Sequence, residues 1–222
     1  MCGRFTLTVD PEELARAFNL TTVPDFAPRY NIAPTQNALV ITAERPAEAQ
    51  FMRWGLIPSW AKDPAMGAKL INARSETAPE KPSFRTALKK RRCIIPVSGF
   101  FEWQAQAGGK QPLYITITDS PLVALAGLWE NWRDPAGQDV RTFTILTTAA
   151  NDFMRSFHDR MPVILHREDW PVWMERTEVP EPVLAGLMQR TFEPERMRSV
   201  PVSKVVNKPA VDSPECITPL SA

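Results

Sequence analysis

Residues 93–118 read CIIPVSGFFEWQAQAGGKQPLYITIT. This stretch opens a series of short apolar runs that are rich in β-branched and aromatic residues, which favour strands over helices. The runs cover 93–97, 99–104, 112–118, 122–130 and 140–147. Gly108 and Gly109 lie between two of these runs and predict a hairpin turn. The middle of the chain therefore predicts consecutive short strands.

The flanking sequence adds strands and a few helices to this series. Asp10, Pro11 and Glu13 form a helix start, with Asp10 as the N-cap. The 22 prolines against nine glycines favour short elements joined by rigid loops. Further strands are expected at 4–9, 37–43 and 50–54, and helices near 83–91 (capped by Ser83), 149–156, 167–176 and 181–190. We expect one α+β domain, residues 1–222, in which residues 203–222 form an extended C-terminal tail.

Composition excludes several classes of protein. A length of 222 residues allows one sizeable core, and 44% hydrophobic and 23% charged residues are ordinary for a globular protein. No apolar run reaches the roughly 18 residues of a membrane span. The three cysteines form no CxxC pair, and the two histidines lack zinc-ligand spacing. We therefore expect a cytoplasmic protein with no structural metal and no cofactor.

The net charge of +1 conceals a basic segment. Between Arg53 and Arg92 there are ten Lys or Arg against three Asp or Glu, and the segment ends in four basic residues, 89–92. Such a face can bind a polyanion. It can also simply keep a helix soluble, which is the interpretation we favour for 89–92.

The second residue, Cys2, is a candidate nucleophile. An initiator Met before a residue as small as Cys is normally removed, which would leave a thiol and a free α-amine on one residue. In model compounds these groups titrate near ~8.5 and ~7.7–8.0, so both have reactive fractions at neutral pH. The alternative is an ordinary buried cysteine, which behaves as a small hydrophobic residue.

Three further stretches place polar residues in apolar surroundings. Asn72 and Arg74 would face one side of an extended chain. Glu102 stands among aromatic residues, where desolvation would raise its pKa, unless it points outward from a half-buried strand. His158 is followed by an acid and a base, Asp159 and Arg160, and is a candidate proton shuttle, or a loop histidine held by hydrogen bonds. For His166 we favour a structural place at a helix start.

The chain resembles the SRAP (SOS response-associated peptidase) family of abasic-site-processing proteins. The resemblance spans nearly the whole chain in the family's order. It rests on Met1–Phe5, Arg29–Thr35 (RYNIAPT), Trp54–Pro58 (WGLIP), Ile71–Thr77 (INARSET), Arg92–Pro96 (RCIIP), Gly99–Trp103 (GFFEW), His158–Pro162 (HDRMP) and Pro201–Asn207 (PVSKVVN). It implies the SRAP fold, a barrel-like core of mostly antiparallel short strands with peripheral helices.

The resemblance also implies a reaction with damaged single-stranded DNA. Cys2 would form a thiazolidine crosslink with the aldehyde of an abasic site, shielding the lesion. Glu102 would orient the α-amine and take its protons, His158 would act as acid and base on the sugar, and Asn72 would hold the amine or the sugar. Self-processing at Met1–Cys2, a cysteine-type peptidase (hydrolase) activity, and slow lyase-like reversal of the adduct are also implied.

DNA contacts follow from the same resemblance together with charge and stacking. Positively charged side chains suit phosphates, and aromatic side chains stack on unpaired bases of any sequence. The expected contacts are Arg4, Arg74 and Thr147 to the strand, and Pro34, Trp60 and Trp103 to the bases beside the lesion. Single-stranded DNA containing abasic sites is the expected partner, with no membrane, and a monomer associated with the nucleoid is the expected state.

Two other functions remain open. A chain that begins Cys-Gly after Met loss could be an N-terminal-nucleophile hydrolase or amidotransferase, although 222 residues leave little room for an ammonia-acceptor domain. The second alternative is a non-catalytic binder of single-stranded DNA, which would bind intact and abasic strands equally.

Overall fold

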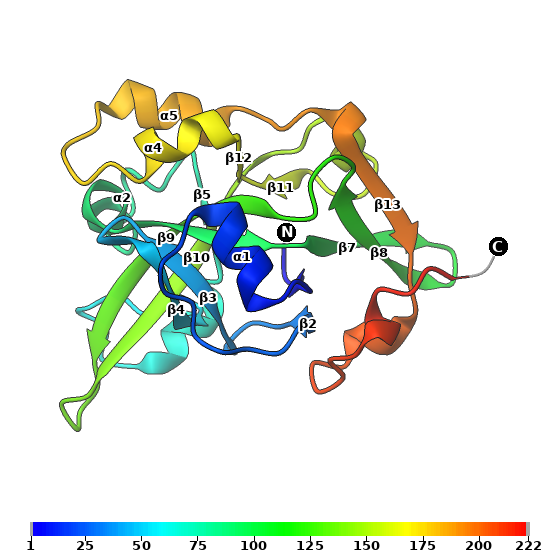
Figure 1. Cartoon of the computed structure of the whole chain (residues 1–222), viewed down its shortest axis with the longest axis horizontal. Helices are drawn as coiled ribbons and strands as arrows, with labels where there is room; N and C mark the ends of the chain where they lie inside the picture. The colour runs from blue at the N-terminus through cyan, green and yellow to red at the C-terminus, as the bar shows by residue number, and fades with distance from the viewer. Residues whose placement is uncertain (1, 221–222) are drawn as a thin grey trace.

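Five strands close a barrel at the centre of the computed structural model, which describes residues 2–220 (Figure 1). Their order is β10-β4-β3-β6-β9, and β9 pairs again with β10. The pairing of β4 with β10 is parallel and the others are antiparallel. The strands are β3 (Asn37–Thr42), β4 (Arg45–Trp54), β6 (Arg92–Val97), β9 (Val123–Arg133) and β10 (Asp139–Ala149).

A second, antiparallel sheet stands beside the barrel. A single residue, Ser98, connects the barrel strand β6 to this sheet. The expected hairpin is confirmed, because β7 and β8 pair around a turn in which Gly109 has a φ of +115°. The sheet runs in the order β13 (Met197–Pro201), β8 (Gly109–Ile117), β7 (Gly99–Gln106), β1 (Phe5–Leu7) and β2 (Arg29–Ile32).

Three short strands extend the edges of the barrel. β5 (Asn72–Arg74) pairs in parallel with the end of β10. β11 (Arg160–Pro162) pairs with the last residues of β10, and β12 (Ile164–Leu165) pairs with β9. The C-terminal end of β10 therefore contacts both the segment that carries Asn72 and the segment that follows His158.

The helices lie outside the barrel (Figure 1). At the start of α1 the Asp10 carboxylate accepts a hydrogen bond from the Glu13 amide at 2.8 Å, which confirms the expected N-cap. The α-helices are α1 (Pro11–Phe18), α2 (Arg85–Lys90), α3 (Asp152–Arg155), α4 (Trp170–Trp173) and α5 (Glu181–Gln189). The 3-10 helices are η1 (Pro64–Lys69), η2 (Arg167–Asp169), η3 (Pro194–Arg196), η4 (Lys204–Asn207) and η5 (Pro214–Cys216).

Aromatic packing joins the barrel to the second sheet. Trp54 is fully buried between Phe5 of β1 and Phe143 of β10, at ring-centroid distances of 4.9 and 6.3 Å. Its indole Nε1 donates to the Ile71 carbonyl at 2.9 Å, directly before β5. Burial of an aromatic side chain of this size contributes about 3–5 kcal/mol, judged by the cost of truncating one. The cluster therefore fixes β1, β5 and β10 relative to one another.

The expected α+β domain with a barrel-like core is confirmed, with local corrections. The prediction that Ser83 caps this helix is wrong. α2 begins at Arg85, and its N-cap residue is Phe84, which makes no side-chain hydrogen bond to the helix. β4 begins at Arg45 rather than at residue 50, and the expected helix over 167–176 is divided into η2 and α4. Residues 203–217 are not an extended tail, because they contain η4 and η5 and bury Val206 and Cys216.

Among residues 2–220, no helix is both long enough and apolar enough to span a bilayer.

Candidate active site

Strand β1 determines where the start of the chain lies. It sits between β2 and β7, and the Phe101 amide of β7 donates to the Arg4 carbonyl at 2.9 Å. The residues before β1 therefore run beside Phe101 and Glu102. Cys2 is fully buried there, and its Sγ lies 4.0 Å from the Arg4 carbonyl oxygen. The fold thus draws the predicted nucleophile into its interior.

The surroundings of Cys2 keep its thiol protonated. Burial and, after it, the negative charge of Glu102 raise the pKa of Cys2 to about 12. Glu102 is itself only 5% exposed. At neutral pH the resting group is therefore a neutral thiol, and a reaction here must begin at another group or remove the thiol proton first.

Asn72 is in direct contact with Cys2. Its Nδ2 donates to the Cys2 carbonyl oxygen at 2.9 Å, across 70 residues of sequence. The contact is possible because β5 pairs with β10, with Asn72 opposite Ile145. The Oδ1 atom of Asn72 is buried and has no hydrogen-bond partner within residues 2–220. A buried acceptor of this kind is costly unless a donor reaches it, so it marks a place for an amine or hydroxyl.

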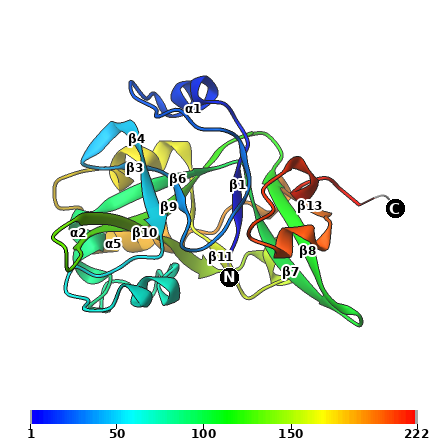
Figure 2. The same cartoon turned by 90° about the horizontal axis from the view of Figure 1, so that it is seen from below.

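His158 lies between α3 and β11, and its side chain is 31% exposed. Its Nδ1 accepts a hydrogen bond from the Arg160 amide at 3.0 Å and lies 2.7 Å from Asp159 Oδ1. The first described residues lie beside β11 and β7 in both views (Figures 1 and 2). The structure therefore brings Cys2, Asn72 and Glu102 together and places His158 two residues before the start of β11.

A charged network that sequence reasoning missed adjoins His158. Arg160 donates to both carboxylate oxygens of Glu76, at 2.6 and 2.8 Å, and to the Thr147 carbonyl at 2.6 Å. Glu76 and Arg160 both belong to motifs that carried the family resemblance. The signal was therefore present in the sequence, but nothing there shows that the two side chains meet.

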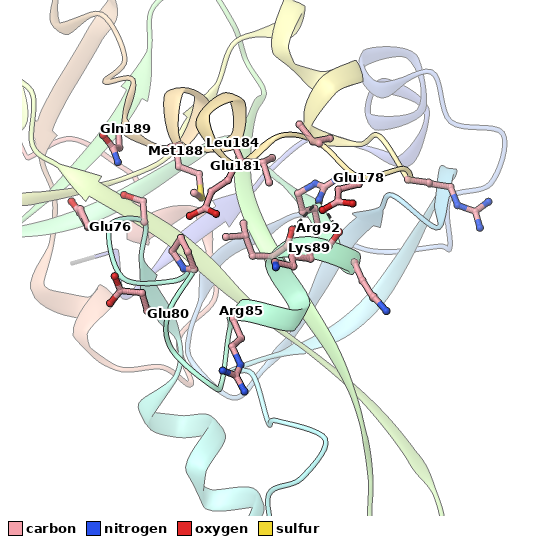
Figure 3. Close-up of a pocket in the computed structure, with 17 residues that line it drawn as sticks. Glu76, Glu80, Arg85, Lys89, Arg92, Glu178, Glu181, Leu184, Met188 and Gln189 are labelled. Atoms are coloured by element: carbon pink, nitrogen blue, oxygen red, sulfur yellow. Dashed lines mark hydrogen bonds between the residues drawn. The ribbon is translucent and has the colours of Figure 1, made fainter.

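Within residues 2–220, no group of three or more His, Cys, Asp or Glu side chains is placed to hold a metal ion. A cavity of about 500 Å³ lies between α2 and α5 (Figure 3). Its lining includes Leu88, Leu184 and Met188, with Glu76 at one side, but not Cys2. The cavity is therefore separate from the cluster around Cys2.

Comparison with known proteins identifies the family. The family model for SOS response associated peptidase (SRAP) matches residues 1–209. The chain belongs to the SRAP family.

Its relatives share both sequence and fold. The abasic site processing protein YoqW of Bacillus subtilis (strain 168) is 43% identical over 98% of this chain and 99% of its own. The abasic site processing protein HMCES of Xenopus tropicalis is 31% identical over 98% of this chain and 78% of its own. A crystal structure of a protein from Bacteroides thetaiotaomicron has a TM-score of 0.89 at 27% identity, covering 99% of this chain and 100% of that one.

The predicted DNA contacts of this SRAP protein fall into two groups. Arg74 is exposed at the end of β5, and Trp60 is 56% exposed. Pro34 and Trp103 are half-buried. These four side chains reach the surface and remain predicted contacts.

The other two predicted contacts are used inside the SRAP domain. Thr147 is fully buried, and its hydroxyl donates to the Ala73 carbonyl at 3.4 Å. Arg4 donates through Nη1 to Asn31 Oδ1 at 2.8 Å and to the Val206 carbonyl at 2.7 Å. A phosphate contact by Arg4 would have to replace these bonds.

Residues 203–217, which we call the C-terminal strap, form one wall beside the candidate site. Asn31 donates from Nδ2 to the Val206, Lys208 and Val211 carbonyls. Asn207 Oδ1 accepts from the Trp103 indole at 2.8 Å. The strap therefore holds side chains on both sides of the Cys2 segment.

The basic run at 89–92 is divided between exposed and internal residues. Arg92 is buried and donates to carbonyls that include Leu88 and Trp173. Arg91 pairs with Glu130 at 2.7 Å. Only Lys89 and Lys90 stay exposed, so half of the run stabilises the fold. His166 is the N-cap residue of η2, as expected for a structural histidine.

Proposed function

We propose that this protein captures abasic sites in single-stranded DNA through a covalent bond to Cys2. The observation that carries the proposal is the placement of Cys2 between the amide of Asn72 and the carboxylate of Glu102. The naming of the relatives as abasic site processing proteins supports the same conclusion.

The α-amine of Cys2 reacts first in this proposal. Loss of Met1, which lies outside the described residues, provides the amine. The amine attacks the aldehyde of the ring-opened sugar, a C=N bond forms, and water leaves. Glu102 accepts the amine proton, and the unpaired Oδ1 of Asn72 accepts from the amine or from a sugar hydroxyl. His158 donates the proton that opens the sugar ring.

The thiol reacts second. Because its pKa is about 12, it is a poor nucleophile until a partner removes its proton. It then adds to the imine carbon, so that a C–S bond forms and the proton moves to the nitrogen. The closure is intramolecular and gains a large effective molarity. Reversal of these steps belongs to the same proposal, since it uses the same groups. Self-processing at Met1–Cys2 is proposed to use the thiol alone: it attacks the Met1 carbonyl, the C–N bond breaks as a thioester forms and frees the amine, and water then hydrolyses the thioester to release methionine.

Single-stranded DNA is the proposed substrate form because stacking needs unpaired bases. Trp60 and Trp103 supply aromatic faces, and Pro34 supplies an apolar edge. Arg74 supplies a positive charge at the end of the strand that carries Asn72.

The test is a denaturing gel of tag-free protein mixed with a labelled single strand containing one abasic site. We expect a heat-stable shifted band, absent with an intact strand and with Cys2→Ala. Cys216→Ala, which removes another buried cysteine, serves as the matched control and should retain the band. Cys2→Ser keeps the amine but lacks the thiol, so it should give a band only after borohydride reduction of the imine.

Two outcomes would contradict the proposal. Absence of a band with protein shown by mass spectrometry to have lost Met1 would favour a simple DNA binder, with equal affinity for intact and abasic strands. Hydrolysis of glutamine by the purified protein would favour an amidotransferase.

A further inference from the structure

The ion pair between Glu76 and Arg160 is a two-bond link that is anchored at its arginine. The Arg160 side chain is 11% exposed and donates to both oxygens of the Glu76 carboxylate, whose side chain is 42% exposed. This two-bond geometry fixes orientation as well as distance. Hydrogen bonding from Arg160 is also the main reason that the pKa of Glu76 lies below its usual value.

The two ends of this link reach different parts of the candidate site. Glu76 follows β5, the strand that carries Asn72. Arg160 begins β11, two residues after His158. The pair therefore ties the segment of Asn72 to the segment of His158.

Strand β10 lies between these segments and completes the link. Arg160 donates to the Thr147 carbonyl at 2.6 Å, and Ala149 is its partner in the β10–β11 ladder. Thr147 Oγ1 contacts the Ala73 carbonyl of β5 at 3.4 Å. The buried Thr147 thus belongs to the same network.

The backbone of Arg160 acts directly on the imidazole ring. Its amide lies 3.0 Å from Nδ1 of His158. The Asp159 carboxylate approaches the same Nδ1 at 2.7 Å. Because both contacts engage Nδ1, we assign proton transfer to Nε2.

We propose that Glu76 and Arg160 are positioning residues for His158: the pair fixes the backbone that contacts Nδ1 of the ring and sets the place of the ring relative to Asn72. The expected effect on crosslinking rests on the proposed function. The positioning of the His158 ring by Glu76 and Arg160 does not depend on that function.

The first experiment reads the ring itself. The chain has only two histidines, His158 and His166, so ¹⁵N chemical shifts of the ring nitrogens can be assigned to each. We expect Glu76→Gln to change the His158 shifts and to leave unchanged those of His166, the N-cap residue of η2, for which no contact with Glu76 or Arg160 is found within residues 2–220. Glu80→Gln is the matched control, since it removes an exposed carboxylate from the same loop.

The second experiment measures the rate constant of crosslinking with protein in saturating excess over an abasic strand. We expect Glu76→Gln to lower it about 10- to 100-fold, the range that a misplacement of about 1 Å can cost. Affinity for an intact strand, measured in a Cys2→Ala background, should match that of Glu80→Gln. The double variant Glu76→Gln/His158→Gln should be no slower than His158→Gln alone, because both changes remove one function.

Several results overturn the inference. Unchanged His158 shifts in Glu76→Gln contradict its geometric part. A crosslinking rate equal to that of Glu80→Gln, or losses that multiply in the double variant, contradict the positioning of His158. Absence of any adduct with the wild-type protein contradicts the proposed function instead, and the ring shifts still decide whether the pair holds His158.

Discussion

At the scale of single residues, Cys2 combines a reactive group with an environment that suppresses its ionisation. The buried thiol is neutral beside the carboxylate of Glu102. A neutral thiol is slow to oxidise or to react with unrelated electrophiles, since the thiolate is the reactive form. The proposed order of reaction, amine before thiol, follows from this suppression.

The raised pKa of Cys2 predicts a loss of stability at alkaline pH. The pKa of Cys2 is about 12 in the folded state, against an ordinary value of 9.0. The contribution of this residue to the free energy of unfolding is therefore fully present below pH 9 and is lost as the pH rises from 9 to 12. At pH 10 the loss of unfolding free energy attributable to Cys2 is on the order of 1 kcal/mol, because the thiol ionises in the unfolded state and not in the folded state. Denaturant unfolding at pH 7 and pH 10 should show a smaller pH effect in Cys2→Ala than in the wild type. An identical pH effect in both proteins would contradict the prediction.

Asn72 predicts a graded effect of substitution. Asn72→Asp keeps an acceptor but loses the donor to the Cys2 carbonyl, whereas Asn72→Ala loses both. We expect Asn72→Ala to slow crosslinking more than tenfold, since loss of orientation at a reacting group is costly, with Asn72→Asp between it and the wild type. Single-turnover kinetics test this, with the exposed Asn37→Ala as control. Equal rates for Asn72→Ala and Asn37→Ala would remove Asn72 from the mechanism.

At the scale of elements, strand β2 and the C-terminal strap depend on each other. Asp212 accepts hydrogen bonds from the Tyr30 and Asn31 amides and pairs with Arg29. Asn31, fully buried, bonds Arg4 and three carbonyls of the strap. The strap therefore replaces a further strand at this edge of the sheet.

Removal of the Asn31 side chain should be strongly destabilising. Asn31→Ala leaves several buried carbonyls and the Arg4 guanidinium without a partner, each at a cost of about 1–3 kcal/mol. We expect a loss of at least about 2 kcal/mol in the free energy of unfolding and faster proteolysis after residue 203. Thermal denaturation and limited proteolysis measure these effects. An unchanged melting temperature would show that water replaces the lost bonds.

At the scale of the whole molecule, closure of the barrel depends on a residue without a side chain. A Cβ added to Gly127 of β9 would lie 2.2 Å from Ile95 Cδ1 and 2.8 Å from the Thr144 carbonyl oxygen. The isoleucine tip can move, but the carbonyl belongs to β10 and cannot. Strands β6, β9 and β10 therefore meet this closely only because position 127 is glycine.

Gly127→Ala should destabilise the protein by about 1–3 kcal/mol, as overpacking of a core does. Gly108→Ala is the control, because a Cβ there meets no atom within 4 Å. Calorimetry of both variants tests the prediction. Equal melting temperatures would mean that the barrel expands without cost.

Most strands of the barrel and of the hairpin were predictable because they contain short runs rich in apolar and β-branched residues. The first half of β4, RPAEA, is not such a run, so the strand was predicted only from residue 50. Their closure was not, because the parallel contact of β4 with β10 joins residues some 90 apart and leaves no local pattern. β5 is only three residues long, so the contact of Asn72 with Cys2 was equally hidden. The strap was predicted as extended because proline suggests extension, whereas burial of Val206 and Cys216 folds it into 3-10 turns.

The hydrogen bond between Arg4 and Val206 joins residues 202 apart. During synthesis, β1 leaves the ribosome long before β7 or the strap exists, so of its partners only β2 is made early. Folds dominated by such distant contacts assemble slowly. The segment around Cys2 therefore stays open to processing enzymes throughout translation and is enclosed only once nearly the whole chain has been made.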